Sequence, residues 1–354
     1  MDDEEKFQAK ISKFRAAFPL AAFDRELDVD AKHKQILKES SLSEIWMQDL
    51  NYRNLKNWHM QGDMGAPPSW GALIRSGFMI FKEAPLFFYR VLFHRKLVKE
   101  LRGSIADDLS AINYIGGLDL LQANPVHLTP GNAPYVLKRN TSYNSRWLRY
   151  IYISTQIRKF QLIEGDAIWV DIGSYYGGLQ SIIKKWHPQT SIILVDFHHQ
   201  LLRSYIFLSE MFPDSIHNLG IAGNTQKIQP GTITYIPVTE FSDLNQLNVT
   251  LITNFFSFGE MKRSDYDSYI SSPVVQNSKF IYSINRFVSA PFFDPTYDSD
   301  LTVWDYRMKD FASIYFDVFP IHHFLAIKRK LWGQIRYRNV SSSYFEFIQS
   351  RTSR

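Results

Sequence analysis

Two carboxylate residues stand at the ends of short apolar runs of this chain, in positions where side chains can bind a ligand. Asp171 follows the run 167–170 and precedes a glycine-containing turn over residues 173–178. Asp196 ends a second apolar, β-branched run that begins at residue 191. Such runs are typical of strands in a parallel sheet with both faces covered, and open α/β sheets bind ligands at the carboxyl ends of their strands. We therefore expect both acids at a ligand-binding edge of one sheet.

The glycine turn favours an amine-bearing cofactor over a dinucleotide. Gly173 and Gly177 can adopt positive φ angles and let a ligand approach the backbone closely. A dinucleotide fingerprint has glycines at the first, third and sixth positions, but Tyr175 occupies the third position here. Its phenol would obstruct a pyrophosphate, and Asp171 would add negative charge beside it. S-adenosylmethionine instead carries sulfonium and ammonium groups, which a carboxylate suits directly or through water.

Asp196 stands where a βαβ unit places the acid that binds a ribose. Both hydroxyls of a ribose can donate to one carboxylate at such a strand end. The alternative is that Asp196 caps the next helix, because residues 200–202 have a helical pattern. For the glycine turn, the alternative is a strand–helix corner that binds no ligand.

The composition limits the class of protein. The chain has 354 residues, of which 45% are hydrophobic, so it can hold one large or two ordinary globular domains. It has no cysteine, which excludes disulfides, thiolate metal ligands and cysteine nucleophiles. The acidic start over residues 2–5 is unlike the basic start of a secretory signal. We expect a cytoplasmic protein.

Basic residues gather within and after an apolar, aromatic stretch over residues 70–93. Charged residues and a proline inside this stretch argue against a membrane-spanning helix. One interpretation is an amphipathic helix that contacts the inner membrane surface through residues 70–102, which would suit a lipid-linked substrate. The simpler interpretation, which we favour, is a helical subdomain with a solvated basic face. The basic residues form no nucleic-acid-reading motif, so we expect no nucleic-acid partner.

The chain divides near residue 140. Residues 1–139 carry mainly helical, aromatic-rich patterns, such as 43–58 and 85–101, and contain a proline-punctuated connector. Residues 140–354 alternate helical patterns with short apolar strands, which is typical of an α/β domain. Beyond the two runs above, we expect strands over 232–238, 249–254, 279–284, 314–322 and 343–349, and helices over 143–160, 264–273 and 300–311.

Two segments resemble methyltransferase motifs. The turn 171–178 resembles the first motif of class I S-adenosylmethionine-dependent methyltransferases. Segment 253–261 resembles the sugar O-methyltransferase family of bacterial surface-glycan gene clusters, and the resemblance covers roughly residues 140–350. The family pattern Asn-Thr-x-Ser-Phe-x-Glu-Met is matched here by Asn254, Ser257, Phe258, Glu260 and Met261. The chain departs from the family after the second strand, where Phe197 and His198 replace a leucine and a proline.

The resemblance implies a Rossmann-like, seven-stranded sheet with helices on both faces, preceded by an N-terminal helical subdomain. It implies an S-adenosylmethionine-dependent O-methyltransferase that acts on a sugar hydroxyl of a glycan or glycan precursor, either free or lipid-linked. The cofactor-binding residues that we assign on this basis are Asp171, Gly173, Ser174, Tyr175, Gly177, Asp196, Phe197 and Asn254.

Methyl transfer from a sulfonium mainly requires that the acceptor oxygen be aligned with the methyl group. A sugar hydroxyl is a weak nucleophile, so a general base should help to remove its proton. Glu260 and His198 are the leading candidates for that base, and the pair of His322 and His323 is a third option. Glu260 can instead be a structural carboxylate that caps a helix, and a histidine in a loop can simply be exposed.

No residue cluster calls for a metal ion. Some methyltransferases use a divalent cation to lower the pKa of their acceptor, which takes several carboxylate and amide oxygens. Asp196, Asn254 and Glu260 are the alternative set of ligands, but no tight cluster of carboxylates lies near the fourth strand. We therefore expect no metal.

Two other classes of function remain open. A nucleotide- or NAD-dependent sugar-modifying enzyme would need an open pyrophosphate path, against which Tyr175 argues. A non-catalytic binding protein in glycan assembly could keep the methyltransferase fold. The presence of Asp171, Gly173 and Asp196 argues against a loss of cofactor binding. The sequence contains no motif that identifies the acceptor.

Overall fold

The computed structural model describes residues 3–19, 105–125, 135–138, 141–143, 145–289, 301–321, 325–329, 335–339 and 344–352. The chain forms two compact units. The first contains residues 1–43, 156–319 and 342–354, and the second contains residues 44–155 and 320–341.

This division differs from the expected boundary near residue 140, because the first helix groups with the large sheet and not with the rest of the front region. The helical patterns at 43–58 and 85–101, and the basic stretch 70–102, lie outside the described residues.

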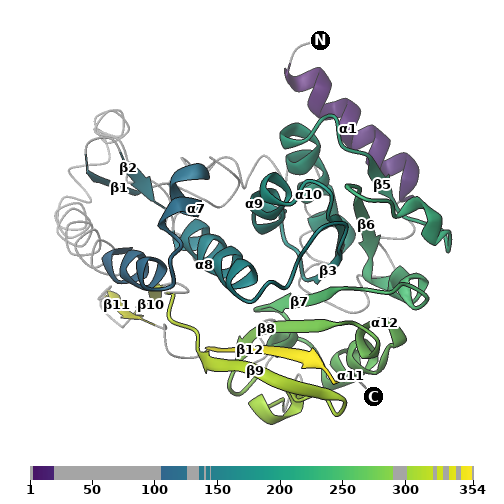
Figure 1. Ribbon diagram of the computed structural model, residues 1–354. Helices are drawn as coiled ribbons and strands as arrows, with labels where there is room; N and C mark the ends of the chain where they lie inside the picture. The colour runs from purple at the N-terminus through teal and green to yellow at the C-terminus, as the bar shows by residue number, and fades with distance from the viewer. Residues whose placement is uncertain are drawn as a thin grey trace. The chain divides into compact units, whose positions relative to one another are not determined.

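In the part of the chain that the structure describes, the first unit is built on a mixed sheet of eight strands (Figure 1). Its order is β5-β6-β4-β3-β7-β8-β12-β9, in which the first six strands are parallel and β12 is antiparallel to both of its neighbours. The strands are β3 (Ile168–Ile172), β4 (Ser191–Asp196), β5 (His217–Leu219), β6 (Ile233–Pro237), β7 (Leu251–Phe255), β8 (Phe280–Arg286), β9 (Phe311–Val318) and β12 (Tyr344–Arg351).

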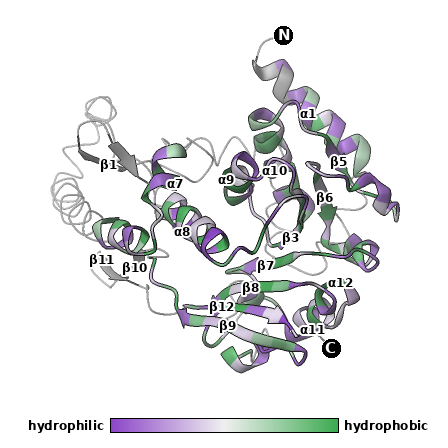
Figure 2. Ribbon diagram, in the orientation of Figure 1, coloured by the Kyte–Doolittle hydropathy of each residue, from purple (hydrophilic) through white to green (hydrophobic). Residues whose placement is uncertain are grey.

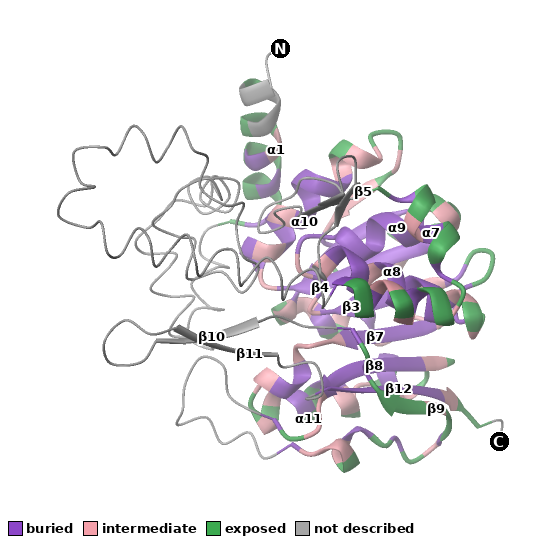
Figure 3. Ribbon diagram, turned by 90° about the vertical axis from the view of Figure 1, so that its left-hand side faces the viewer, coloured by how far each residue is buried: buried purple, intermediate pink, exposed green. Residues whose placement is uncertain are grey.

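The central strands form because their apolar runs are buried on both faces of the sheet. Val170 lies opposite Ile193 on one side and Ile252 on the other. Figure 2 shows the hydrophobic colouring of this part of the sheet, and Figure 3 shows that β7 and β8 are largely buried whereas β9, at the edge, is largely exposed. The apolar sequence thus predicts which strands lie in the middle.

Helices cover both faces of the sheet, as the sequence predicts for this fold class (Figure 1). One face packs against α9 and α10, and the other against α11 and α12. Val274 and Val275 of α12 lie in the same core cluster as Val170 and Ile172. The helices of this unit are α1 (Asp3–Ala17), α9 (Gly178–Trp186), α10 (His198–Met211), α11 (Arg263–Ser271) and α12 (Pro273–Gln276), with 3₁₀ turns η1 (Thr225–Lys227), η2 (Val238–Leu244), η3 (Phe258–Glu260) and η4 (Val303–Tyr306).

Two details of the prediction are wrong. Within the described residues the sheet has eight strands and not seven, because the short β5 adds an edge strand beside β6. The expected helix over 300–311 is only the single 3₁₀ turn η4. A reciprocal capping box between Thr302 and Asp305 closes that turn, and the chain then extends into β9.

The second unit is described in fewer residues. Residues 105–114 are helical and precede α7 (Leu118–Ala123). Two antiparallel hairpins pair β1 (Tyr135–Lys138) with β2 (Thr141–Tyr143), and β10 (Leu325–Arg329) with β11 (Ile335–Asn339). Helix α8 (Ser145–Lys159) begins in this unit and ends in the first. Across the described parts of both units, no helix has the length and apolar character needed to cross a membrane.

Candidate functional site

A cavity of about 760 Å³ opens at the carboxyl ends of the parallel strands β3, β4, β6 and β7. Residues just after the ends of these strands line it, including Gly173, Phe197, Val238 and Ser257. Strands β4 and β7 lie on opposite sides of β3, so the strand order reverses here. Ligands of open α/β sheets bind at such a switch point.

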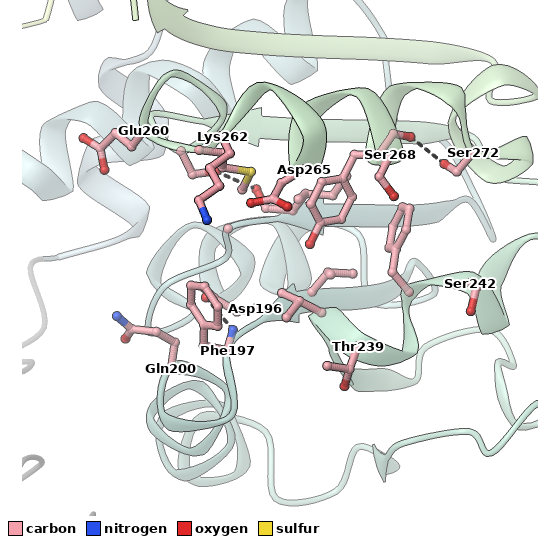
Figure 4. A pocket seen from close by; sticks show the side chains of 18 of the residues that line it. Asp196, Phe197, Gln200, Thr239, Ser242, Glu260, Lys262, Asp265, Ser268 and Ser272 are labelled. Carbon is pink, nitrogen blue, oxygen red and sulfur yellow. Dashed lines mark hydrogen bonds between the residues drawn. The ribbon is translucent and has the colours of Figure 1, made fainter. Parts of the chain in front are cut away.

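The cavity has two facing walls (Figure 4). Lys262, Asp265 and Ser268, of α11 and the residue before it, lie on one side, and Asp196 and Thr239 lie on the other. The apolar part of the lining comes from Ile172, Val195, Phe197, Val238, Phe241, Met261, Tyr269 and Pro273. A largely apolar chamber with a few polar groups is the usual form of a small-molecule site.

The glycine turn after β3 has the backbone that only glycine adopts without strain. Gly173 has a φ of +82°, and its N–H donates to the Val195 carbonyl at 2.8 Å. A Cβ atom at this position would lie 2.3 Å from Ser257 Oγ. Gly177, at φ +92°, caps α9, and a Cβ there would meet Leu208 at 2.9 Å. Gly173 lines the cavity, whereas Gly177 is not among its lining residues.

Asp196 holds the glycine turn against the tip of β4. Its Oδ2 accepts from the N–H of Tyr175 at 2.8 Å, and its Oδ1 accepts from the N–H of Phe197 at 2.8 Å. Tyr175 takes a left-handed φ of +53° to make this bond, a conformation that is uncommon for a residue with a side chain. All three residues line the cavity. Asp196 therefore both shapes the turn and faces the ligand space.

Asp171 lies behind the turn and does not line the cavity. Its carboxylate is buried, and it accepts hydrogen bonds from Thr253 Oγ1 at 2.5 Å and from Gln180 Nε2. Burial, together with the nearby negative charge of Asp196, raises the pKa of Asp171 to about 7, against the lowering effect of these two donors. Asp171 therefore lies behind the turn, out of direct contact with the cavity.

Asn254 ties the strand ends together. Its Nδ2 donates to the Ile172 carbonyl at 2.8 Å and to Ser257 Oγ at 2.5 Å. Its Oδ1 accepts from the Phe258 N–H at 3.0 Å and from Asn285 Nδ2 at 3.0 Å. The side chain is buried and is absent from the cavity lining, so it supports the site from the second layer.

Ser174 and His198 also lie away from the cavity. Ser174 is buried, and its hydroxyl has no hydrogen-bond partner among the described residues. His198 is the first residue of α10, is fully buried and packs edge-on against the ring of Phe18, with 5.1 Å between ring centroids. Because the ring points into this packing with α1, we do not assign His198 as the general base. The third option, His322 and His323, lies outside the described residues.

Glu260 lines one end of the cavity (Figure 4). It closes the turn η3 and forms an ion pair with Arg286, at 3.5 Å between Oε1 and the guanidinium. Arg286 in turn donates from Nε to the Tyr344 hydroxyl at 3.2 Å and lies over the Tyr344 ring. Glu260 is therefore the candidate base that the structure places beside the cavity, with Arg286 fixing its orientation.

Several lining residues were not predicted from the sequence. Phe241 lies on η2, beyond the expected strand 232–238, and Tyr269 and Asp265 lie on α11, within the expected helix 264–273. Burial raises the pKa of Asp265, and the nearby Lys262 opposes this shift. No short-range signal marks these residues, because their role depends on how α11 folds back over the strand ends.

The described residues contain no group of three or more histidine, aspartate and glutamate side chains arranged to hold a metal ion. Of the alternative ligand set, Asp196 and Glu260 line the cavity. The Asn254 amide instead donates to the Ile172 carbonyl of β3 and accepts from the Phe258 N–H of η3.

No family model and no curated protein matches the chain. Solved structures with a similar fold include the magnesium protoporphyrin IX methyltransferase of Synechocystis with bound S-adenosylhomocysteine (SAH), at 10% identity over 59% of this chain and 84% of that one, with a TM-score of 0.37. A S-adenosylmethionine-dependent methyltransferase of Anabaena variabilis is 11% identical over 69% and 94%, with a TM-score of 0.35. The plantazolicin methyltransferase BpumL in complex with SAH is 11% identical over 73% and 99%, with a TM-score of 0.37.

Proposed function

We propose that the chain is an S-adenosylmethionine-dependent O-methyltransferase whose acceptor is a sugar hydroxyl of a glycan or glycan precursor. The observation that carries the proposal is Asp196, a carboxylate at a strand tip that faces a largely apolar cavity beside a glycine turn. When bound, S-adenosylmethionine supplies an electrophilic methyl group on a sulfonium.

The chemistry of Asp196 suits a ribose. Each of its oxygens accepts one backbone N–H, from Tyr175 or from Phe197. A carboxylate at a strand tip can accept hydrogen bonds from both hydroxyls of a ribose. The two backbone donors hold the carboxylate still, which reduces the entropy lost when the ligand binds.

The rest of the cavity suits an adenine base. Val238, Phe241 and Tyr269 offer apolar and aromatic surface, on which an adenine ring can stack. Thr239 and Ser268 add hydroxyl groups that can hydrogen-bond the edge of the base. Asp171 lies behind the glycine turn, outside the cavity lining, and the negative charge of its ionised form favours the cationic end of the cofactor.

Glu260 is the residue that we assign to the acceptor. It lies at the same end of the cavity as Gln200, away from Ser242 and Ser272 (Figure 4). A carboxylate there can accept the proton of an acceptor hydroxyl as the oxygen attacks the methyl group. The sugar specificity follows from the resemblance of segment 253–261 to sugar O-methyltransferases.

Titration calorimetry with S-adenosylmethionine, SAH and NAD tests the proposal. We expect both sulfur compounds to bind and NAD to show no heat of binding, because Tyr175 occupies the position that a pyrophosphate would need. Absence of binding by both sulfur compounds would overturn the proposed function. Binding of NAD instead would favour the dinucleotide alternative.

A further inference from the structure

Asp171 belongs to a buried chain of hydrogen bonds that none of the sequence motifs identifies. The indole Nε1 of Trp169 donates to Thr253 Oγ1 at 2.7 Å, and that hydroxyl approaches Asp171 Oδ1 at 2.5 Å. A threonine hydroxyl has one proton, and because its oxygen already accepts from the indole, the proton is directed at Asp171. On the other side, Gln180 Nε2 donates to Asp171 Oδ2.

The register of the sheet explains this arrangement. Asp171 lies directly opposite Thr253 in the parallel pair of β3 and β7, and Trp169 is two residues earlier on the same face of β3. Gln180 lies in the first turn of α9, which packs on that face. All four side chains are at least 97% buried. This series of hydrogen bonds therefore lies in the interior of the fold and is not a surface contact.

Among the described residues, the groups that bond to Asp171 or act on its charge include no cation. Thr253 of β7 and Gln180 of α9 are neutral donors, and Asp196 at the end of β4 is the charged group that acts on it, with the same sign. Burial of a carboxylate under these conditions raises its pKa, here to about 7. Protonated and ionised forms of Asp171 are thus close in free energy near neutral pH.

Gln180 can serve both forms of Asp171. Its Oε1 is buried and has no hydrogen-bond partner among the described residues, while its Nε2 donates to the carboxylate. Turning the amide by half a rotation would present Oε1 to a protonated carboxyl group, which could then donate to it. An amide is the side chain that offers a donor and an acceptor at almost the same place.

We propose that Gln180 and Thr253 are positioning residues of the cofactor site, and that they hold Asp171 so that binding of the cofactor's cationic end releases a proton from its carboxyl group. The O–H bond of the carboxyl breaks, and the proton passes to the solvent buffer. The proposal rests on the proposed function, because it requires an amine-bearing ligand in the cavity.

Calorimetry with SAH between pH 5.5 and 8, in buffers of different ionisation enthalpy, measures the number of protons released. For the wild-type chain we expect release on binding, and an affinity that falls by up to about tenfold per pH unit toward acid pH, the limit for one linked proton. The isosteric variant Asp171→Asn has no carboxyl proton to release at this position. Its SAH affinity should therefore depend less on pH than that of the wild-type chain. Asp214→Asn, at an exposed position, is the matched control and keeps the wild-type profile.

Gln180→Leu and Thr253→Val give a second readout that does not depend on Asp171→Asn folding. Each removes one donor to the carboxylate, so the pH at which the proton is lost should move upward while the far-ultraviolet circular dichroism stays unchanged. An Asp171→Asn profile that matches the wild type, or unmoved profiles in both donor variants, would refute the positioning role while leaving the proposed function intact. If SAH does not bind to the wild-type chain at any pH, the proposed function fails, and this inference fails with it.

Discussion

Replacement of Gly173 by alanine tests whether the glycine turn is built as described. The added Cβ meets two separate penalties. The backbone φ of +82° is in the left-handed region, and the new atom would lie 2.3 Å from Ser257 Oγ and 2.8 Å from Ser257 Cβ. Ser257 cannot yield freely, because its hydroxyl accepts from Asn254 Nδ2 at 2.5 Å. The clash should therefore displace the turn or the end of β7.

The magnitude follows from these two terms. A residue with a side chain in the left-handed region costs about 1 kcal/mol. Overpacking of a filled site costs about 1–3 kcal/mol more. We therefore expect Gly173→Ala to lower the free energy of unfolding by roughly 2–4 kcal/mol, and to weaken SAH binding because Gly173 lines the cavity.

Gly165→Ala is the matched control for this experiment. Gly165 also has a positive φ, +57°, but a Cβ at that position meets no atom within 4 Å. Gly165→Ala should lower the free energy of unfolding by the backbone cost alone, about 1 kcal/mol, and leave the SAH affinity unchanged. Urea unfolding and calorimetry on both variants supply the two readouts. If Gly173→Ala costs no more than Gly165→Ala and binds SAH normally, the description of the turn is incorrect.

Three further predictions address the carboxylates. Asp196→Asn should weaken SAH binding about ten- to a hundredfold in calorimetry, because hydrogen bonds to a charged group contribute about 1.5–3 kcal/mol; unchanged affinity would remove Asp196 from the ribose site. Glu260→Gln should leave SAH binding intact and reduce methyl transfer to a glycan acceptor by about a hundredfold or more; undiminished transfer would make Glu260 structural. For Asp171, the pKa of about 7 in the folded chain lies above the ordinary value of 3.8, so the folded state binds more protons between these values and its stability falls as the pH rises through them. Asp171→Asn should therefore stabilise the ligand-free protein at pH 8 by on the order of a few kcal/mol and have little effect near pH 4, as measured by urea unfolding; equal effects at both pH values would contradict this account.

The sequence predicts the strands of the sheet well where they are apolar and continuous. β3 and β4 match their predicted runs closely, because a strand buried on both faces needs an uninterrupted apolar sequence. The three-residue β5 has no such run, and its inclusion depends on pairing with β6. In the segment 300–311, the helical spacing of polar and aromatic residues is overridden by the capping box of η4 and by the pairing of β9 with β12.

The candidate site is predictable only where it is local in sequence. Gly173 and Asp196 follow directly from strand ends, and both line the cavity. The partners Thr253 and Gln180 of Asp171 are specified by the sheet register and by the packing of α9, which one sequence does not reveal. His198 illustrates the same limit, because its ring packs against Phe18, which is far away in the sequence.

A crystal structure of the chain with SAH would show directly whether Asp196 binds the ribose. We expect the ribose hydroxyls within hydrogen-bond distance of the Asp196 carboxylate, and the adenine among Val238, Phe241 and Tyr269. The amine end should lie toward the turn that begins at Gly173. SAH bound elsewhere, or bound in this cavity with its ribose away from Asp196, would contradict it.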